Sequence, residues 1–154
     1  MRIIAIDPGS KCGWAIRTET SAGVSYDSGT WDLSARRHEG GGMRFLRVRK
    51  YLGELLAAGA DALVYEEVRR HMSTDAAHVY GGIVAVVQAE CESRAIPYKG
   101  IPVGTIKKQA TGKGNADKVA MLAAARAKWA GWDGDDNEAD ARWIAETGAK
   151  EVGA

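Results

Sequence analysis

The sequence predicts an α/β fold, a mixed five-stranded sheet flanked by helices, whose first three strands form an antiparallel meander. Two observations support this. Three strand-like segments follow one another at the start of the chain, and every later strand-like segment comes after a helical pattern, so it must return to the sheet through a crossover. The 154 residues are enough for one domain with a substantial core, and we expect residues 1–154 to form a single domain.

The first strand is expected over Arg2 to Ile6, a run of bulky apolar residues with no helical period. Asp7 ends this run, and Pro8-Gly9 turns the chain sharply. Residues 14–18 would then return as the second strand, and residues 24–31 alternate well enough to form the third.

The remaining elements follow from periodicity and from capping residues. We expect a basic, glycine-rich loop over 34–42, a helix over 43–58 with Gly59 as its C-cap, and a strand over 61–68. A helix from Thr74 or Asp75 to Arg94, a strand over 96–101 and a helical turn over 102–109 should follow. The last two elements are a helix over 116–129 capped by Asn115 and a helix from Asp135 or Asp136 through Thr147.

Composition excludes several classes of protein. A hydrophobic content of 45% and a charged content of 27% are typical of a globular protein. The two cysteines lack metal-site spacing and favour a reducing compartment, no secretory signal is evident, and no apolar stretch reaches the length of a membrane span. We therefore expect a cytoplasmic protein with no membrane association.

The net charge of +1 hides a segregated distribution. Basic residues dominate 36–50 and 99–128, whereas acids dominate 133–154. This pattern indicates a basic binding face beside a cluster of carboxylates, although solvated surface charge is the commoner explanation for any single run.

Acidic residues occur at three places where an expected strand ends or a helix begins. They are Asp7, the pair Glu66-Glu67, and the segment 135–140. If the first and fourth strands are neighbours, Asp7 and Glu66 lie side by side, and the last helix would bring Asp140 toward them. Clustered carboxylates suit hard divalent cations, and two such ions about 4 Å apart can activate water against a phosphodiester.

Each acid also has a structural interpretation. Asp7 would cap the turn that follows it, and Glu66 or Glu67 would be a solvated acid at a strand end. Asp135 with Glu138 fits a capping box, and acids in a first helical turn favour the helix dipole.

Lysines form the second candidate cluster. Lys107, Lys108, Lys113 and Lys118 surround a loop with two glycines, which suits contacts to backbone phosphates. The alternative is an ordinary surface loop. A nucleotide P-loop is excluded, because Gly112-Lys113 lacks the preceding glycine and the following Ser or Thr of that motif.

Four segments of the chain resemble RuvC-like Holliday junction resolvases. They are Ile6-Asp7-Pro8-Gly9, Val64 to Val68, Lys107 to Lys118, and Asn137 to Ala141, in the order of that family. The departures from the better-known members indicate a divergent or phage-type branch. The resemblance implies a ribonuclease H-like fold and a homodimeric endonuclease that nicks two opposed strands of a four-way DNA junction. It also implies two Mg²⁺ ions per active site, with Mn²⁺ as a substitute.

The resemblance implies roles for individual residues. Asp7, Glu66 and Asp140 would bind metal and act in catalysis, and the fourth ligand would be Asp136, with Asn137 as the alternative. Lys118 would act in catalysis beside the scissile phosphate, and DNA contacts would come from Lys107, Lys108, Lys113, Lys118, Arg69 and Arg70. Where better-known members carry an aromatic wedge after the second acid, this chain has Arg69-Arg70-His71.

Symmetric nicking requires a two-fold axis, and the helix expected from Thr74 to Arg94, with its small residues, is the candidate dimer interface. The closest alternative is a ribonuclease H-like nuclease that acts on RNA or on other branched DNA without junction symmetry. A nucleotide-binding domain of the actin and sugar-kinase type and a non-cleaving junction binder are further alternatives. The need for a helper translocase stays open.

Overall fold

The computed structural model describes residues 1–153, which contain five strands and five helices. The strands are β1 (Arg2–Asp7), β2 (Lys11–Thr20), β3 (Gly23–Asp32), β4 (Ala62–Glu67) and β5 (Tyr98–Pro102). The helices are α1 (Gly42–Leu56), α2 (Thr74–Ser93), α3 (Val103–Thr111), α4 (Lys118–Lys128) and α5 (Asp136–Gly153).

The five strands form one mixed sheet in the order β3-β2-β1-β4-β5. Strand β1 pairs antiparallel with β2 and parallel with β4, β2 pairs antiparallel with β3, and β4 pairs parallel with β5. The predicted meander and the predicted adjacency of the first and fourth strands are both confirmed.

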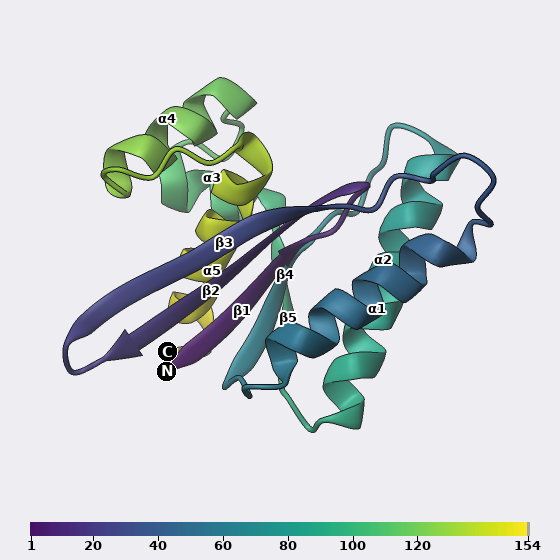
Figure 1. The fold of residues 1–154 in the computed structure, drawn as a ribbon. Coiled ribbons are helices and arrows are strands. Elements are labelled where there is room, and N and C mark those ends of the chain that lie inside the picture. The colour runs from purple at the N-terminus through teal and green to yellow at the C-terminus, as the bar shows by residue number, and fades with distance from the viewer. Residues whose placement is uncertain (154) are drawn as a thin grey trace.

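Helices cover both faces of the sheet (Figure 1). Helices α1 and α2 lie on one face, and α3, α4 and α5 lie on the other. Alternate residues of β1 divide between the two layers: Ile3 and Ala5 pack under α5, whereas Ile4 and Ile6 pack under α1 and α2. This alternation decides which way the acids at the strand ends face.

Helix α5 lies close to the sheet because a glycine faces β4. A Cβ on Gly148 would come within 2.6 Å of Cγ2 of Val64, which is closer than van der Waals contact. The end of α5 also lies beside the start of β1, since a Cβ on Gly153 would lie 3.8 Å from the terminal methyl of Met1. Close packing of α5 therefore fixes the position of the residues at its other end.

One of the small residues of helix α2 packs against helix α1 of the same chain. Gly82 faces the ring of Phe45 on α1, and a Cβ at Gly82 would overlap that ring. Gly81 is exposed, with open space beyond it. The predicted dimer interface on this helix is therefore reduced to its exposed side, because Gly82 serves the packing of α1 against α2.

Several element boundaries differ from those expected. Helix α4 begins at Lys118, because the Asp117 side chain accepts a hydrogen bond from the Ala120 amide at 2.8 Å; the cap predicted at Asn115 is wrong. Helix α1 ends at Leu56, and its C-cap is Ala57 in place of the predicted Gly59. Helix α5 continues beyond the predicted end at Thr147. Within residues 1–153, no helix is both long and apolar enough to span a membrane.

Candidate active site

Asp7 and Glu66 lie side by side at the ends of two neighbouring parallel strands. Ile6 is paired with Tyr65, so the next residue of each strand follows in register. Asp7 continues the Ile3 and Ala5 side of β1, and Glu66 continues the Ala62 and Val64 side of β4. Both acids therefore face the α3, α4 and α5 layer.

Glu67 takes the opposite direction, as strand alternation requires. Leu63 and Tyr65, which share its side of β4, pack in the α1 and α2 layer. The Glu67 carboxylate makes a 3.4 Å ion pair with Arg69. The structure thus places Glu66 in the candidate site and leaves Glu67 outside it.

A pocket of about 270 Å³ contains both acids. Its lining combines four carboxylates from separate segments with lysines and apolar side chains: Asp7, Glu66, Val103, Ile106, Lys107, Asp117, Lys118, Met121, Asn137, Asp140 and Ile144. Residues from β1, β4, α3, α4 and α5 therefore meet in one concave site.

The start of α5 is fixed to β3 by two of its acids. The Asp135 carboxylate accepts hydrogen bonds from the Glu138 amide at 2.8 Å and from the Thr30 hydroxyl at 2.9 Å. The Glu138 carboxylate accepts one from the Ser28 hydroxyl at 3.0 Å. The capping interpretation of Asp135 is confirmed, and these contacts hold the helix so that Asn137 and Asp140 face the pocket.

The two alternatives for the fourth ligand occupy different positions. Asn137 lines the pocket directly. Asp136 lies at its edge, where its carboxylate is 3.7 Å from the Lys118 ammonium. Asp136 is near enough to raise the pKa of Asp140, so both residues border the same charge cluster.

The carboxyl groups of the pocket disfavour one another's ionisation. Burial raises the pKa of Asp7 well above its ordinary value of 3.8, and the negative charges of Glu66 and Asp140 raise it further. Burial, with the charges of Glu66 and Asp136, raises the pKa of Asp140 to about 7. A bound cation would relieve this repulsion, and perturbed carboxyl groups that share a concave pocket are typical of functional sites.

The candidate basic residues are distributed over several surfaces. Lys107 and Lys118 line the pocket; Lys107 is half-buried, whereas the Lys118 side chain is 84% exposed. Lys108 lies on another side of α3 and lines a groove with Lys150 of α5. The structure therefore brings two of the predicted basic residues to the carboxylates.

The other three basic candidates line none of these cavities. Lys113, Arg69 and Arg70 are exposed on the loops that flank the pocket. Arg69 pairs with Glu67, and all three side chains are exposed enough to contact a ligand larger than the pocket itself.

The donor set fits hard divalent cations, which prefer carboxylate and amide oxygens. Within residues 1–153, no group of three or more His, Cys, Asp or Glu side chains already forms a metal-binding cluster. Asp7, Glu66 and Asp140 share one pocket without converging on one point. The chemistry of the pocket is suitable, and metal binding would require its carboxylates to draw closer.

Two residues that shape the site were not predicted. The Tyr80 hydroxyl donates a hydrogen bond to the Glu66 carbonyl at 2.8 Å and accepts one from the Val68 amide at 3.0 Å, which fixes the end of β4. Gly13, paired with Asp7, faces the backbone of Asn137. A glycine inside a strand is a sequence signal of close backbone approach, but nothing in the sequence indicates the role of Tyr80.

Comparison with known proteins gives structural matches only. No protein-family model matches the chain, and no curated protein matches it either. RuvC from Thermus thermophilus, in complex with a Holliday junction substrate, matches with a TM-score of 0.82 at 20% identity, covering 99% of this chain and 94% of that one. A second Thermus thermophilus RuvC structure matches with a TM-score of 0.81, also at 20% identity, covering 99% of this chain and 97% of that one.

A viral protein shares the architecture at lower similarity. The fowlpox virus resolvase, in complex with a substrate Holliday junction, matches with a TM-score of 0.63 at 12% identity, and the alignment covers 99% of each chain. The strand order and the helices on both faces agree with these matches over nearly the whole chain. The chain therefore has the ribonuclease H-like fold of RuvC, and in fold it resembles the RuvC-like Holliday junction resolvases.

Proposed function

We propose that this protein is a metal-dependent endonuclease that resolves four-way DNA junctions by paired, symmetric nicks. One observation carries the proposal: Asp7, Glu66 and Asp140, from three separate elements, line a single pocket beside two lysines. The fold shared with two proteins whose structures contain Holliday junctions supports the choice of DNA substrate.

The carboxylates are assigned to metal binding. Asp7, Glu66 and Asp140 would hold two Mg²⁺ ions, with Mn²⁺ as a substitute, and Asn137 or Asp136 would supply a further oxygen. Bound ions of this kind supply a Lewis acid and an activated water for phosphodiester hydrolysis. The raised pKa values of Asp7 and Asp140 are consistent with this assignment, because burial and the neighbouring carboxylates disfavour negative charge in the pocket and a cation would offset that effect.

The lysines are assigned to the DNA backbone. Lys107 lies half-buried at the pocket and would orient the phosphodiester by its charge. Lys118 is exposed and 3.7 Å from Asp136, so it is free to exchange this partner for a phosphate oxygen and stabilise charge that develops there. Lys108, Lys113, Arg69 and Arg70 would contact the arms of the junction.

A homodimer is part of this proposal, because two opposed nicks require two sites related by a two-fold axis. The exposed side of α2 is the candidate interface. Light scattering of the purified protein measures its molar mass in solution and so tests whether it is a dimer. We also propose a cytoplasmic location for the protein.

A comparison of substrates tests the proposal. Purified protein with Mg²⁺ is given a synthetic four-way junction, a linear duplex of the same sequence and an RNA–DNA hybrid, and the nicks are mapped on denaturing gels. We expect paired nicks in opposed strands of the junction, with 5′-phosphate ends, and little cutting of the other two substrates.

Other outcomes would select the alternative functions. Equal cutting of linear and branched DNA, or preferential cutting of the hybrid, would indicate a ribonuclease H-like nuclease without junction symmetry. Tight junction binding with no cutting in Mg²⁺ or Mn²⁺ would indicate a non-cleaving binder.

A further inference from the structure

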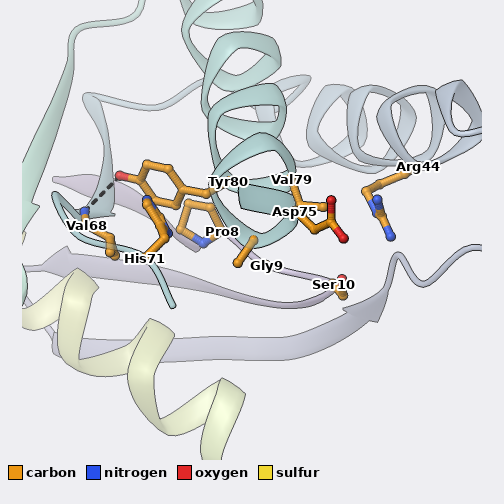
Figure 2. Close-up of a pocket in the computed structure, with 10 residues that line it drawn as sticks. Pro8, Gly9, Ser10, Arg44, Val68, His71, Asp75, Val79 and Tyr80 are labelled. Carbon is orange, nitrogen blue, oxygen red and sulfur yellow. Dashed lines mark hydrogen bonds between the residues drawn. The ribbon is translucent and has the colours of Figure 1, made fainter. Parts of the chain in front are cut away.

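A second cavity, of about 580 Å³, lies on the other side of the β1 end from the candidate active site. It is formed by the turn after β1, the loop after β4, and helices α1 and α2 (Figure 2). Its lining residues are Pro8, Gly9, Ser10, Arg44, Val68, His71, Asp75, Ala76, Val79 and Tyr80. None of them is assigned a role in catalysis above.

Residues that are close in the chain line the candidate active site and this second cavity. Asp7 lines the first pocket and Pro8 lines the second. On β4 the relation repeats, because Glu66 lines the first pocket and Val68 lines the second. The two cavities therefore lie on either side of the same two strand ends, so a DNA strand with a phosphodiester at Asp7 would pass beside the second cavity.

One end of the cavity is aromatic and apolar. The rings of His71 and Tyr80 lie with their centroids 4.8 Å apart, and Pro8 is at the same end (Figure 2). Tyr80 is held in place by its two backbone hydrogen bonds, to Glu66 and Val68. A fixed aromatic surface of this kind suits stacking of a nucleobase.

The other end carries opposite charges that are not joined. Arg44 and Asp75 lie on the same side of the cavity, above Ser10 (Figure 2). In the part of the chain that the structure describes, no ion pair links them. Arg44 donates through Nε to the Leu33 carbonyl at 3.0 Å, which positions the guanidinium and leaves its other N–H groups available.

An aromatic end and a donor–acceptor end match the two ways in which proteins recognise a single base. The face of a base stacks, and its edge offers both hydrogen-bond donors and acceptors, which Asp75 and Arg44 complement. The volume lies within the range of small-molecule pockets, and the cavity is closed on two sides by helices and the turn.

We infer that this cavity binds one unpaired nucleobase of the DNA strand whose phosphodiester lies at Asp7. The inference rests on the proposed function, because it takes branched DNA as the ligand. It adds a site for the base beside the site for the phosphate, and it assigns the choice of cleavage sequence to Asp75, Arg44 and His71.

An abasic scan tests this inference without requiring cleavage. Four-way junctions are prepared with one abasic residue placed in turn at each position around the branch point, which removes a base and keeps its phosphate. Their affinities are measured by fluorescence anisotropy in EDTA. We expect one position at which the abasic residue weakens binding by the wild-type protein about tenfold.

Two variants connect that position to the cavity. In His71→Ala and in Asp75→Asn, intact and abasic junctions should bind with nearly equal affinity, because the contacts to the base are already missing. His78→Ala, exposed on α2 and outside the cavity, and Glu54→Gln, exposed on α1, are the matched controls and should keep the wild-type difference. Thermal melting establishes that each variant is folded.

Cleavage of the intact junction by the wild-type protein is measured in parallel. A flat abasic scan from a protein that cuts junctions would overturn the base site and leave the proposed function standing. A tenfold abasic effect that persists in both cavity variants would also overturn it. An abasic effect that disappears in the variants, from a protein that never cuts, would support the base site and reject the proposed function.

Discussion

The carbonyl of Asn137 lies directly against Gly13, so closely that a Cβ on residue 13 would overlap this oxygen. Gly13 is also the residue paired with Asp7 across β1 and β2. The contact therefore sets how near α5, with Asn137 and Asp140, can approach Asp7. The absence of a side chain at Gly13 is what lets the sheet and the helix meet at the candidate site.

Gly13→Ala tests this contact. The added methyl group must displace the backbone of α5, and we expect it to lower the free energy of unfolding by about 1–3 kcal/mol and to reduce junction cleavage. Chemical denaturation and a nicking assay measure the two effects. Gly53→Ala on α1 is the control, because its Cβ would make an ordinary 3.5 Å contact with Arg94; an equal loss in both variants would contradict the role of Gly13.

Asp140→Asn should separate stability from activity. Because burial and neighbouring carboxylates raise the pKa of Asp140 to about 7, its ionised form destabilises the fold. That destabilisation is absent below the ordinary pKa of 3.8 and grows until the pH passes 7. In EDTA at pH 8 the variant should therefore be more stable than wild type, by on the order of 1 kcal/mol.

The gain in stability should shrink when the same measurement is made at pH 5. Junction cleavage by Asp140→Asn with Mg²⁺ should be lost. A variant less stable than wild type at pH 8 would show that the carboxylates of the pocket do not repel one another.

The lowered pKa of Glu146 predicts that the free energy of unfolding depends on pH with the opposite sign. It lies in a buried network, where Arg17 donates to its carboxylate at 3.0 Å and Tyr26 also donates to it. Burial raises the pKa of Glu146, but the hydrogen bonds from Tyr26 and Arg17 outweigh it, so the pKa lies below its ordinary value of 4.5. The stabilisation is therefore full above pH 4.5 and is lost as the pH falls through the lowered pKa.

Glu146→Gln should lower the free energy of unfolding at pH 7 by about 2 kcal/mol or more, because Arg17 then lacks its buried partner. The difference from wild type should narrow in acid, as urea unfolding at pH 7 and pH 3 can show. Glu151→Gln is the control, since its ion pair with Lys99 is exposed and worth little. A difference that widens in acid would be inconsistent with the lowered pKa.

Tyr80→Phe removes the hydroxyl that fixes the end of β4. The Glu66 carbonyl and the Val68 amide each lose a partner, and we expect a loss of about 1 kcal/mol in stability and a several-fold lower rate of junction cleavage. Tyr98→Phe is the control, because its hydroxyl donates to the exposed Glu92 carboxylate. Equal cleavage rates for Tyr80→Phe and wild type would show that Glu66 does not depend on this support.

The sheet and the neighbouring acids were predictable because they depend on local patterns. Apolar runs and crossovers specify the strand order, and alternation along β1 and β4 places Asp7 and Glu66 on one face. The helix cap at Asp135 was readable in the same way, although the Glu138 carboxylate bonds to Ser28 and does not complete a capping box. Of the four lysines predicted as one cluster, only Lys107 and Lys118 reach the pocket.

The parts that the sequence did not reveal depend on contacts between distant segments. Gly13 matters only because α5, more than a hundred residues later, packs against it. The second cavity needs α1, α2 and the turn after β1 to meet, and no single segment carries its pattern. The choice between Asp136 and Asn137 depends on the rotation of α5, which the contacts of Asp135 and Glu138 with β3 determine.

The neighbouring residues Glu66 and Glu67 provide the most direct test, because they have the same chemistry and face opposite sides of the sheet. Cleavage of a four-way junction with Mg²⁺ is measured for wild type, Glu66→Gln and Glu67→Gln, and junction binding is measured in EDTA. We predict that Glu66→Gln loses about 100-fold or more in cleavage rate while it still binds, and that Glu67→Gln cuts nearly as fast as wild type. Equal rates for the two variants would contradict the assignment of Glu66, with Asp7 and Asp140, to the chemistry.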